Sequence, residues 1–477
     1  MNFGLKKLYI NGQLIDSSNG DTFDVVCPGD EKKIANIAWA TAEDTNKALW
    51  SAQAGFEYWS ALSTDDRKAW INKLRDKIID HQKLLRESIM YEMGKVWTGT
   101  EEDLTSLTNS LAYYADEVEK RETEKLVDKE GTHKHNMVSK PIGVVVAFLA
   151  YNFPLLNLGF KLGPALASGC SIIIKPSEFS PLSAYIIGEI CASIDFPKGV
   201  INILCGDVEH VGKVLCESRI PKLITLIGST NTAKKLMIQG SHSSLKRYSM
   251  ECGGNAPFIV FPDADLDTAI AHGAALKIGN AGQICVAPNR FFIHTDIIDQ
   301  FLKGMQKKFE GVNVGFGLEA NPDMGPLANK QSIGKISKIV SAAMNQGGEL
   351  LFGGKPLDRS GYYYEPTLIH LKNKEAEVLQ DEVFGPVAMV VSFSTKEEVL
   401  ELSNNTSAGL ASYVYTKDDA KIQFFIDQLE FGEIHINGFK FDIYLPHGGI
   451  KDSGSGVDCS PLALDEYFIQ KRVTQLI

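Results

Sequence analysis

Three residues far apart in the sequence have side chains that could do chemistry together: Cys285, Glu251 and Asn152. A cysteine thiolate attacks an electrophilic carbon, a carboxylate can take a proton from water, and an amide can donate a hydrogen bond to a developing oxyanion. Each lies in a turn-forming segment: NAGQIC (280–285), MECGGN (250–255) and YNFP (151–154). A lone cysteine is most often a small buried apolar residue. None of the three segments is therefore enough, by itself, to identify a catalytic site.

From residue 141 the sequence alternates short β-branched runs with helical segments. We predict strands over 143–149, 171–175, 200–204 and 223–227, and helices over 155–168, 181–193, 208–217 and 232–239. This alternation predicts an α/β fold with a doubly wound parallel sheet. Ligands bind such sheets at the carboxyl ends of the strands. We therefore expect the site in the loops 150–154, 176–179 and 228–230.

A second α/β series begins near Pro257, with predicted strands over 258–261 and 290–294 and helices over 265–279 and 297–309. Apolar residues at helical spacing predict helices through 41–110 and a further helix over 105–121. The segment 122–140 is polar and tolerant of β structure, so we interpret it as an extended arm. The segment 471–477 closes the chain as a strand.

Composition limits the class of protein. The 477 residues suggest two or three domains. A net charge of -11 disfavours a nucleic-acid partner. The longest apolar run, 142–151, is too short to span a membrane, and Met1–Leu14 has no apolar region of a signal peptide. The eight cysteines include no CxxC pair, so a reducing cytoplasm fits best.

The sequence offers no cluster of metal ligands with a known spacing. It contains no HExxH motif, and His133 and His135 are the one pair of histidines at strand spacing in the arm. We favour solvated arm residues over metal ligands for this pair. We therefore expect no metal.

Taken together, these segments resemble the aldehyde dehydrogenase superfamily over nearly the whole chain. The family's catalytic glutamate precedes its cysteine by 34 residues, as Glu251 precedes Cys285, and its ribose-binding glutamate follows by 97, as Glu382 does. The motifs are most similar to succinate-semialdehyde and lactaldehyde dehydrogenases. The matching segments are YNFP (151–154), KPSE (175–178), GST (228–230), MECGGNAP (250–257), GNAGQIC (279–285), EVFGPV (382–387) and PHGGIKDSG (446–454).

The resemblance implies NAD-dependent oxidation of an aldehyde to its acid through a thiohemiacetal and a thioester. Cys285 matches the nucleophile, and Asn152 with the backbone N–H of Cys285 matches the oxyanion donors. Glu251 matches the base that activates water for thioester hydrolysis. Lys175 matches the residue that binds the cofactor ribose and orients Asn152.

The resemblance also implies a set of cofactor residues. A carboxylate at Glu178 can accept a hydrogen bond from the ribose 2′-hydroxyl and repel a 2′-phosphate, which favours NAD and leaves NADP as the alternative. Gly228 and Ser229 let the pyrophosphate approach the next helix N-terminus. The full set is Ala150, Tyr151, Lys175, Ser177, Glu178, Gly228, Ser229, Glu251, Cys252, Gly253, Glu382 and Phe384.

For the substrate, the resemblance leaves several small aldehydes open: succinate semialdehyde, lactaldehyde or its sulfonated analogue. An anionic aldehyde needs a cation in the pocket. Succinate-semialdehyde enzymes commonly carry arginine where this chain has Gly279 and a second cysteine where it has Ala287. The candidate pocket residues are Tyr151, Ile284, Val286, Lys120, Arg121, Lys440 and His447.

Two rival functions stay open at this point. An acylating enzyme would pass the thioester to coenzyme A, but such relatives typically lack the base that Glu251 matches. A non-catalytic binding or structural protein on the same fold would not need the three reactive residues together.

The resemblance further implies the domain division. We expect an NAD-binding domain of 1–121 and 142–250, a catalytic domain of 251–437, and an oligomerisation arm with a C-terminal segment of 122–141 and 438–477. Such arms join subunits through strands, so we expect a homodimer or homotetramer with closed symmetry.

Overall fold

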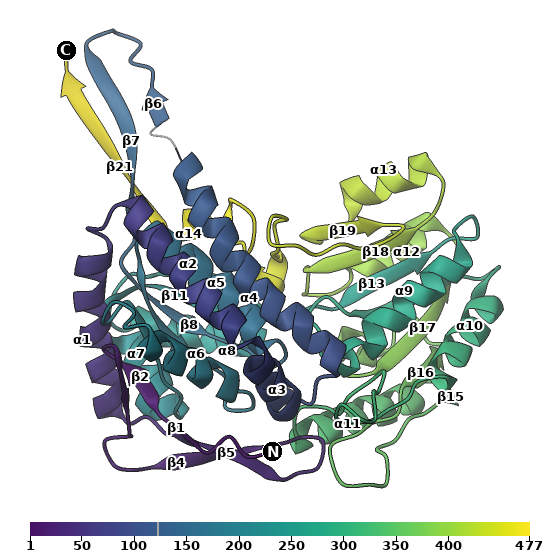
Figure 1. The fold of residues 1–477 in the computed structure, drawn as a ribbon. Helices are drawn as coiled ribbons and strands as arrows, with labels where there is room; N and C mark the ends of the chain where they lie inside the picture. Colours follow the sequence, from purple (N-terminus) through teal and green to yellow (C-terminus); the bar gives the residue numbers. More distant parts are fainter. Residues whose placement is uncertain (122–123) are drawn as a thin grey trace.

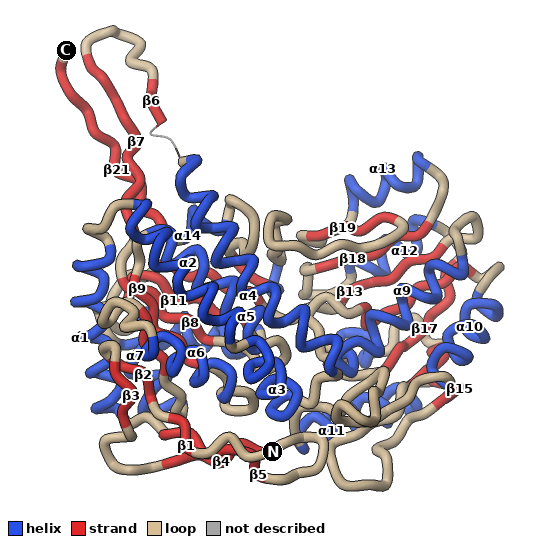
Figure 2. Tube along the Cα trace, viewed as in Figure 1, coloured by secondary structure: helices blue, strands red, loops and turns tan. Residues whose placement is uncertain are grey.

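The computed structural model describes residues 1–121 and 124–477. Figure 1 shows two helix-covered sheets side by side and a narrow β-arm that projects from the first of them and carries the C-terminus. Figure 2 shows that strands alternate with helices through both bodies. The α/β class expected from the sequence is confirmed.

The first sheet has eight strands in the order β20-β12-β11-β8-β9-β10-β2-β3. Its five central strands run parallel, as predicted, and the flanking strands are antiparallel. The parallel strands are β8 (Val144–Phe148), β9 (Ser171–Lys175), β10 (Ile201–Ile203), β11 (Pro221–Ile227) and β12 (Arg247–Glu251), and the antiparallel ones are β2 (Leu8–Ile10), β3 (Gln13–Ile15) and β20 (Gly454–Ser455).

Helices pack on both faces of this sheet. One correction concerns the helix predicted over 105–121, which is the second half of a single helix, α4. The apolar positions Leu104, Leu107 and Leu111 are buried at helical spacing across the expected break, so nothing ends the helix there. The helices are α1 (Ala42–Trp59), α2 (Thr64–Asp80), α3 (Gln82–Met93), α4 (Trp97–Glu117), α5 (Pro154–Ser168), α6 (Leu182–Ser193), α7 (Lys213–Glu217) and α8 (Thr230–Ser241).

Helices α4 and α5 pack closely because of a glycine. A Cβ atom on Gly159 would lie 2.7 Å from the Cα atom of Leu107, so only glycine allows this approach. Helix α5 follows β8 directly, and its first residue, Pro154, suits a helix N-terminus. The close packing fixes the start of α5 and therefore the loop 149–153 that precedes it.

The second sheet has seven strands in the order β15-β16-β17-β14-β13-β18-β19, all parallel except β15. Its strands are β13 (Ala256–Val260), β14 (Pro288–His294), β15 (Gly348–Phe352), β16 (Thr367–Leu371), β17 (Val387–Phe393), β18 (Ala411–Tyr415) and β19 (Glu433–Ile436). Its helices are α9 (Leu266–Ile278), α10 (Ile298–Glu310), α11 (Lys330–Asn345), α12 (Lys396–Asn404) and α13 (Asp419–Gln428).

The arm is a three-stranded antiparallel sheet of β6 (Glu124–Leu126), β7 (His133–Pro141) and β21 (Phe468–Leu476). Strands β7 and β21 pair along their whole length, from Pro141 with Phe468 to His133 with Leu476. The predicted arm began at residue 122, and residues 122–123 lie outside the described part of the chain.

A small sheet near the N-terminus was not predicted. It consists of β1 (Leu5–Lys6), β4 (Thr22–Val26) and β5 (Lys33–Ala38). In the part of the chain that the structure describes, no helix has both the length and the apolar character that a membrane crossing requires.

Candidate active site

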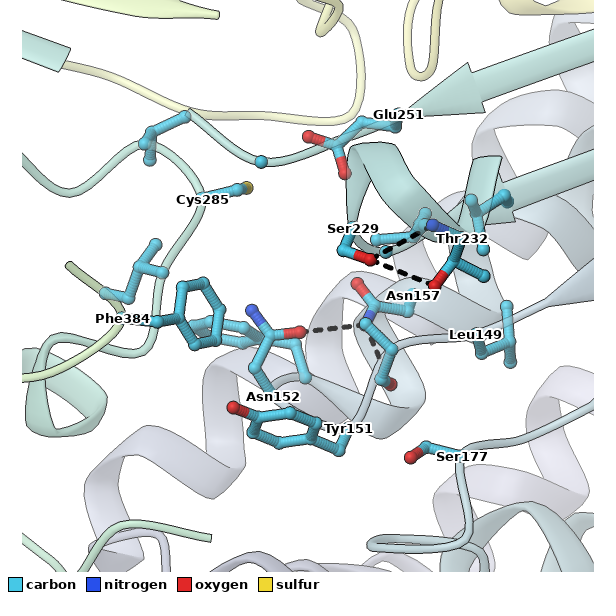
Figure 3. Close-up of a pocket in the computed structure, with 18 of the residues that line it drawn as sticks. Leu149, Tyr151, Asn152, Asn157, Ser177, Ser229, Thr232, Glu251, Cys285 and Phe384 are labelled. Atoms are coloured by element: carbon cyan, nitrogen blue, oxygen red, sulfur yellow. Dashed lines mark hydrogen bonds between the residues drawn. The ribbon is translucent and has the colours of Figure 1, made fainter. Parts of the chain in front are cut away.

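A cavity of about 1500 Å³ lies where the two bodies meet, at the carboxyl ends of β8, β9, β11 and β12. All three loops expected from the sequence contribute to it: 150–154, 176–179 and 228–230. The loop before β14 and the segment 439–447 line it from the other side. Figure 3 shows the centre of this cavity.

Cys285 lies in the loop between α9 and β14, and a strained turn precedes it. Asn280, Ala281 and Gly282 all have left-handed backbone angles, with φ of 48°, 54° and 71°. The buried Gln283 side chain secures the turn, donating to the carbonyl of Asn280 and accepting from the N–H of Ala328. Strain of this kind persists where the surroundings fix the backbone, often at active sites. Cys285 is half-buried, whereas the other seven cysteines are buried.

Glu251 is the last residue of β12, and the glycines after it allow a close approach to the cysteine loop. A Cβ atom on Gly254 would collide with the carbonyl oxygen of Cys285, and one on Gly253 would collide with Glu382. As a result, the Glu251 carboxylate, the Cys285 sulfur and a ring nitrogen of His447 all lie within 4.8 Å of one another. In Figure 3 the sulfur points toward Glu251.

Asn152 follows β8 and is buried, and its amide nitrogen is turned to the same space (Figure 3). Its Nδ2 donates to the carbonyl of Gln283 at 3.1 Å, next to Cys285. Its Oδ1 accepts a hydrogen bond from Asn157 at 3.2 Å. Among the hydrogen bonds of the described residues, Lys175 makes none with Asn152, so the orienting partner is Asn157 rather than the expected lysine.

The charges around the sulfur act in opposite directions. Burial, followed by the negative charge of Glu251, raises the pKa of the Cys285 thiol to about 12, while contact with His447 acts to lower it. Burial lowers the pKa of His447, but hydrogen bonds with Cys285, Glu251 and Glu433 outweigh burial and raise it well above 6.5. His447 is therefore the cationic member of the cluster.

Glu382 and Phe384 reach the cavity from the segment before β17. The N–H of Gly254 donates to Glu382 at 3.0 Å, and burial raises the pKa of this carboxyl to about 7. The Tyr151 ring meets the rings of Phe384 and Phe179 edge to face, at centroid distances of 6.0 and 5.8 Å. A Cβ at Gly253 would collide with Glu382, so only glycine lets this carboxyl lie against the backbone there. Gly253, Glu382 and the Phe384 ring thus form a cradle suited to a flat ligand.

The other expected cofactor residues lie along one side of the cavity. Ser229 caps α8 by accepting a hydrogen bond from the N–H of Thr232. Both residues line the cavity, so the N-terminus of this helix faces it. Lys175 lies 3.5 Å from Glu178. One expected residue does not line the cavity: the Cys252 side chain is buried, and its backbone N–H donates to the carbonyl of Ser453. The residues that do line the cavity are Ala150, Tyr151, Lys175, Ser177, Glu178, Gly228, Ser229, Glu251, Gly253, Glu382 and Phe384.

The predicted substrate residues divide into two groups. Tyr151, Ile284, Val286, Lys440 and His447 line the cavity. Lys120 and Arg121 do not, and this expectation is wrong.

The two excluded cations lie where α4 ends beside the arm, and nearby acids hold them. Lys120 pairs with Glu117 at 2.7 Å. Arg121 pairs with Asp465 at 2.7 Å and lies over the Phe468 ring.

Sequence reasoning missed three residues of the site: Asn157, Glu433 and His435. Glu433 accepts a hydrogen bond from His447 at 2.6 Å and another from His435 at 3.3 Å. A signal was present, because Glu433 and His435 alternate with isoleucines in a short strand and so share one face. Asn157 gave no signal, since a polar residue in a helix is ordinarily solvated.

The fold and the site define an α/β enzyme with a cysteine, a carboxylate and an amide converging at the carboxyl edge of a parallel sheet. The model of the Aldehyde dehydrogenase family matches residues 14–473. The chain belongs to the aldehyde dehydrogenase family, whose members act on aldehydes.

Individual relatives agree with this assignment. The chain is 35% identical to the mitochondrial succinate-semialdehyde dehydrogenase of Oryza sativa subsp. japonica, over 97% of this chain and 88% of the relative. It is 33% identical to the glutarate-semialdehyde dehydrogenase of Pseudomonas aeruginosa, over 97% and 96%. The crystal structure of betaine aldehyde dehydrogenase from Staphylococcus aureus, in complex with NAD+, superposes with a TM-score of 0.95 at 31% identity, covering 99% of this chain and 95% of that one. The expected similarity to succinate-semialdehyde dehydrogenases is confirmed.

Proposed function

We propose that this chain oxidises a small aldehyde to its carboxylic acid with NAD(P), through a covalent intermediate on Cys285. The convergence of the Cys285 sulfur and the Glu251 carboxylate within 4.8 Å carries the proposal. The first group suits attack on the aldehyde and the second suits the later activation of water, so one cavity can serve both half-reactions.

In the first half-reaction the Cys285 sulfur attacks the carbonyl carbon. A C–S bond forms as the carbonyl π electrons move to oxygen, which gives an oxyanion. The Nδ2 of Asn152 and the backbone N–H of Cys285 are the donors for this oxygen. Because Asn157 and Gln283 both hold Asn152, the donor needs little reorganisation when charge develops.

The cavity residues fit a nicotinamide cofactor. Gly253 lets the Glu382 carboxylate lie against its backbone at the cavity, and the α8 N-terminus with Ser229 suits a pyrophosphate. When bound, NAD(P) supplies the two-electron acceptor for the hydride that leaves the substrate carbon, so that the adduct on Cys285 becomes a thioester.

In the second half-reaction Glu251 takes a proton from water, the hydroxide adds to the thioester, and the Cys285 thiolate leaves. Oε1 of Glu251 lies 3.4 Å from Nε2 of His447. A carboxylate oxygen has two lone pairs, so it can accept a further hydrogen bond from a water molecule. This hydrolytic role favours acid formation over transfer of the acyl group to coenzyme A.

For the cofactor we propose a preference for NAD over NADP. Glu178 lines the cavity just after β9, where a carboxylate accepts from a ribose 2′-hydroxyl and repels a 2′-phosphate. A comparison of kcat/KM for the two cofactors tests the preference.

For the substrate we propose a small aldehyde with an anionic group at its far end. Two relatives are named as semialdehyde dehydrogenases. Lys440 lines the same cavity and provides a cation for that group. Succinate semialdehyde leads the candidates, with lactaldehyde and its sulfonated analogue as alternatives.

The test is NADH absorbance with a panel of aldehydes, with and without coenzyme A, using Cys285→Ala as the control. Activity without coenzyme A that disappears in Cys285→Ala supports hydrolytic oxidation. An absolute requirement for coenzyme A supports the acylating alternative. Equal rates in the two proteins reject the covalent mechanism. No activity with any aldehyde favours the alternative of a non-catalytic binding or structural protein.

We also propose that the arm joins subunits and that the protein acts in the cytoplasm as a homodimer or homotetramer. Strand β21 lies at the edge of the arm sheet and is mostly exposed, so it can pair with another subunit. The proposed NAD-binding domain gains β20 from the C-terminal segment, which pairs with β12. Light scattering on the full chain and on a variant ending at Tyr467 tests the arm, since the truncated chain should have a smaller mass in solution.

A further inference from the structure

His447 occupies a fixed position beside the proposed nucleophile. Its backbone forms two hydrogen bonds with the backbone of Asp458, at 2.8 and 2.7 Å. The Asp458 carboxylate is in turn paired with Lys161 of α5 inside the protein. The His447 ring also packs against Phe160, with centroids 6.1 Å apart. The segment that carries the imidazole is therefore tied to the helix that follows Asn152.

Glu433 sets the orientation of the imidazole. Its carboxylate accepts from Nδ1 of His447 at 2.6 Å. Nδ1 therefore carries a proton, and Nε2 is turned to the other side of the ring, where it lies 3.4 Å from Oε1 of Glu251. The Cys285 sulfur belongs to the same cluster, within 4.8 Å.

The carboxylate itself is held in its charged form. Burial raises the pKa of Glu433, but hydrogen bonds from His435 and His447 outweigh burial and lower the pKa to about 2. A charged, buried acceptor at Nδ1 stabilises a positive charge on the ring. Cysteine, histidine and carboxylate thus form a chain of three groups joined by two contacts, as in nucleophilic enzymes whose base is oriented by a third group.

We propose that His447, oriented by Glu433, is a further catalytic residue that takes up the Cys285 proton and so favours the thiolate form of the sulfur. When the thiol ionises, its proton moves to Nε2 of the neutral imidazole, and the thiolate that forms is paired with an imidazolium. The thiolate then attacks with its own electron pair, and the same thiolate is restored when the thioester is hydrolysed. The inference concerns the reactive form of Cys285 in the proposed function and needs no additional reactant.

The surroundings show why the sulfur needs this partner. Burial and the charge of Glu251 both disfavour a thiolate, whereas His447 acts in the opposite direction. Without the imidazolium, the same carboxylate that later activates water would suppress the nucleophile. The titratable groups around the pair are Glu251, Glu382, Glu433, Tyr413, Cys459 and the Lys161–Asp458 ion pair.

Alkylation of Cys285 by iodoacetamide tests the proposal without aldehyde or cofactor. Only the thiolate reacts, so the rate reports the thiolate fraction. The full-length protein and His447→Gln are compared from pH 6 to 9.5 by intact mass, with Cys285→Ala giving the background from the seven buried cysteines. We expect His447→Gln to react at least about tenfold more slowly at pH 7, as a shift of one pKa unit requires, with the difference narrowing as the pH rises.

Two further variants separate this role from a general loss of structure. Glu433→Gln keeps an acceptor at Nδ1 but removes its charge, so its pH profile should shift in the same direction by a smaller amount. His294→Gln removes an imidazole at the end of β14 that does not line the cavity and is bonded to the carbonyl of Ser394, and it should react within about twofold of the unaltered protein. Circular dichroism confirms that each variant is folded.

Two results overturn the proposal: a pH profile of His447→Gln equal to that of the unaltered protein, or a loss that is the same at every pH. The outcome is independent of the proposed function. If the alkylation result is as expected but no aldehyde is oxidised, the proposed reaction fails and the role of His447 stands.

Discussion

The side-chain amide of Asn157 donates a hydrogen bond of 3.2 Å to Oδ1 of Asn152. This bond fixes which end of the Asn152 amide faces the sulfur, because the oxygen is occupied and the nitrogen is turned toward Gln283 and Cys285. Asn157 is thus a positioning residue, since it acts through Asn152.

Asn157→Asp should lower kcat for aldehyde oxidation by about tenfold. A carboxylate cannot donate to Oδ1, so the Asn152 amide loses its orientation and part of its value as an oxyanion donor. Steady-state kinetics with a saturating cofactor measure the effect, and the KM for NAD should change little.

Lys175→Met is the matched comparison for this prediction. Because Lys175 faces the cavity without a hydrogen bond to Asn152 among the described residues, its loss should act mainly on the KM for the cofactor. A fall in kcat with an unchanged KM would restore Lys175 as the residue that orients Asn152.

The elements around this site were predictable where the signal is local. Strand β9 has the bounds predicted for it, because a buried parallel strand is a short β-branched run that needs no partner to be recognised. The pairing of β20 with β12 could not be predicted, because a strand of two residues is too short to show an alternation of apolar and polar side chains. The same holds for the N-terminal sheet, which depends on pairing between β1 and β5.

The site shows the same division. Cys285, Glu251 and Asn152 stand in segments whose spacing matches the family, so they could be placed from the sequence. The partners of these residues could not, because contacts between distant elements decide them. Lys120 and Arg121 illustrate the error. Their positive charge suggested that they bind the substrate, but in the structure they form ion pairs with Glu117 and Asp465.

Glu251→Gln should separate the two half-reactions. The amide cannot take a proton from water, so the thioester should form once per subunit and then persist. We expect a burst of about one NADH per site, followed by a steady rate lower by roughly 10²- to 10⁴-fold, as loss of a general base implies. Rapid mixing measures both phases. An unchanged steady rate would remove Glu251 from the role of base.

Gly253→Ala should weaken cofactor binding more than it slows the chemistry. The added Cβ would collide with Glu382, which must then move out of the cradle. We expect the KM for NAD to rise by about tenfold, an energy of about 1.4 kcal/mol. Gly334→Ala is the control, because a Cβ there meets nothing within 4 Å and the site lies inside α11. The control should keep its kinetics and gain up to about 1 kcal/mol of stability. Equal KM values for NAD in the two variants would contradict a role of Gly253 in binding the cofactor.

Glu92→Gln should change how stability depends on pH. Glu92 is fully buried and accepts from the N–H groups of Leu182 and Ser183 at the start of α6. Burial raises the pKa of this carboxyl from 4.5 to about 7. Between these values the folded protein binds the proton more tightly than the unfolded chain does, so the contribution of Glu92 to stability falls as the pH rises from about 4.5 through 7, by up to about 3 kcal/mol.

The glutamine cannot ionise, so its contribution to stability stays constant over this range. The Tm of Glu92→Gln minus the Tm of the unaltered protein should therefore increase between pH 5 and pH 8. Differential scanning fluorimetry at one-unit steps measures the difference. A difference that is flat with pH would show that Glu92 is already ionised at pH 5 and that the two N–H groups at the start of α6 stabilise its charge despite its burial.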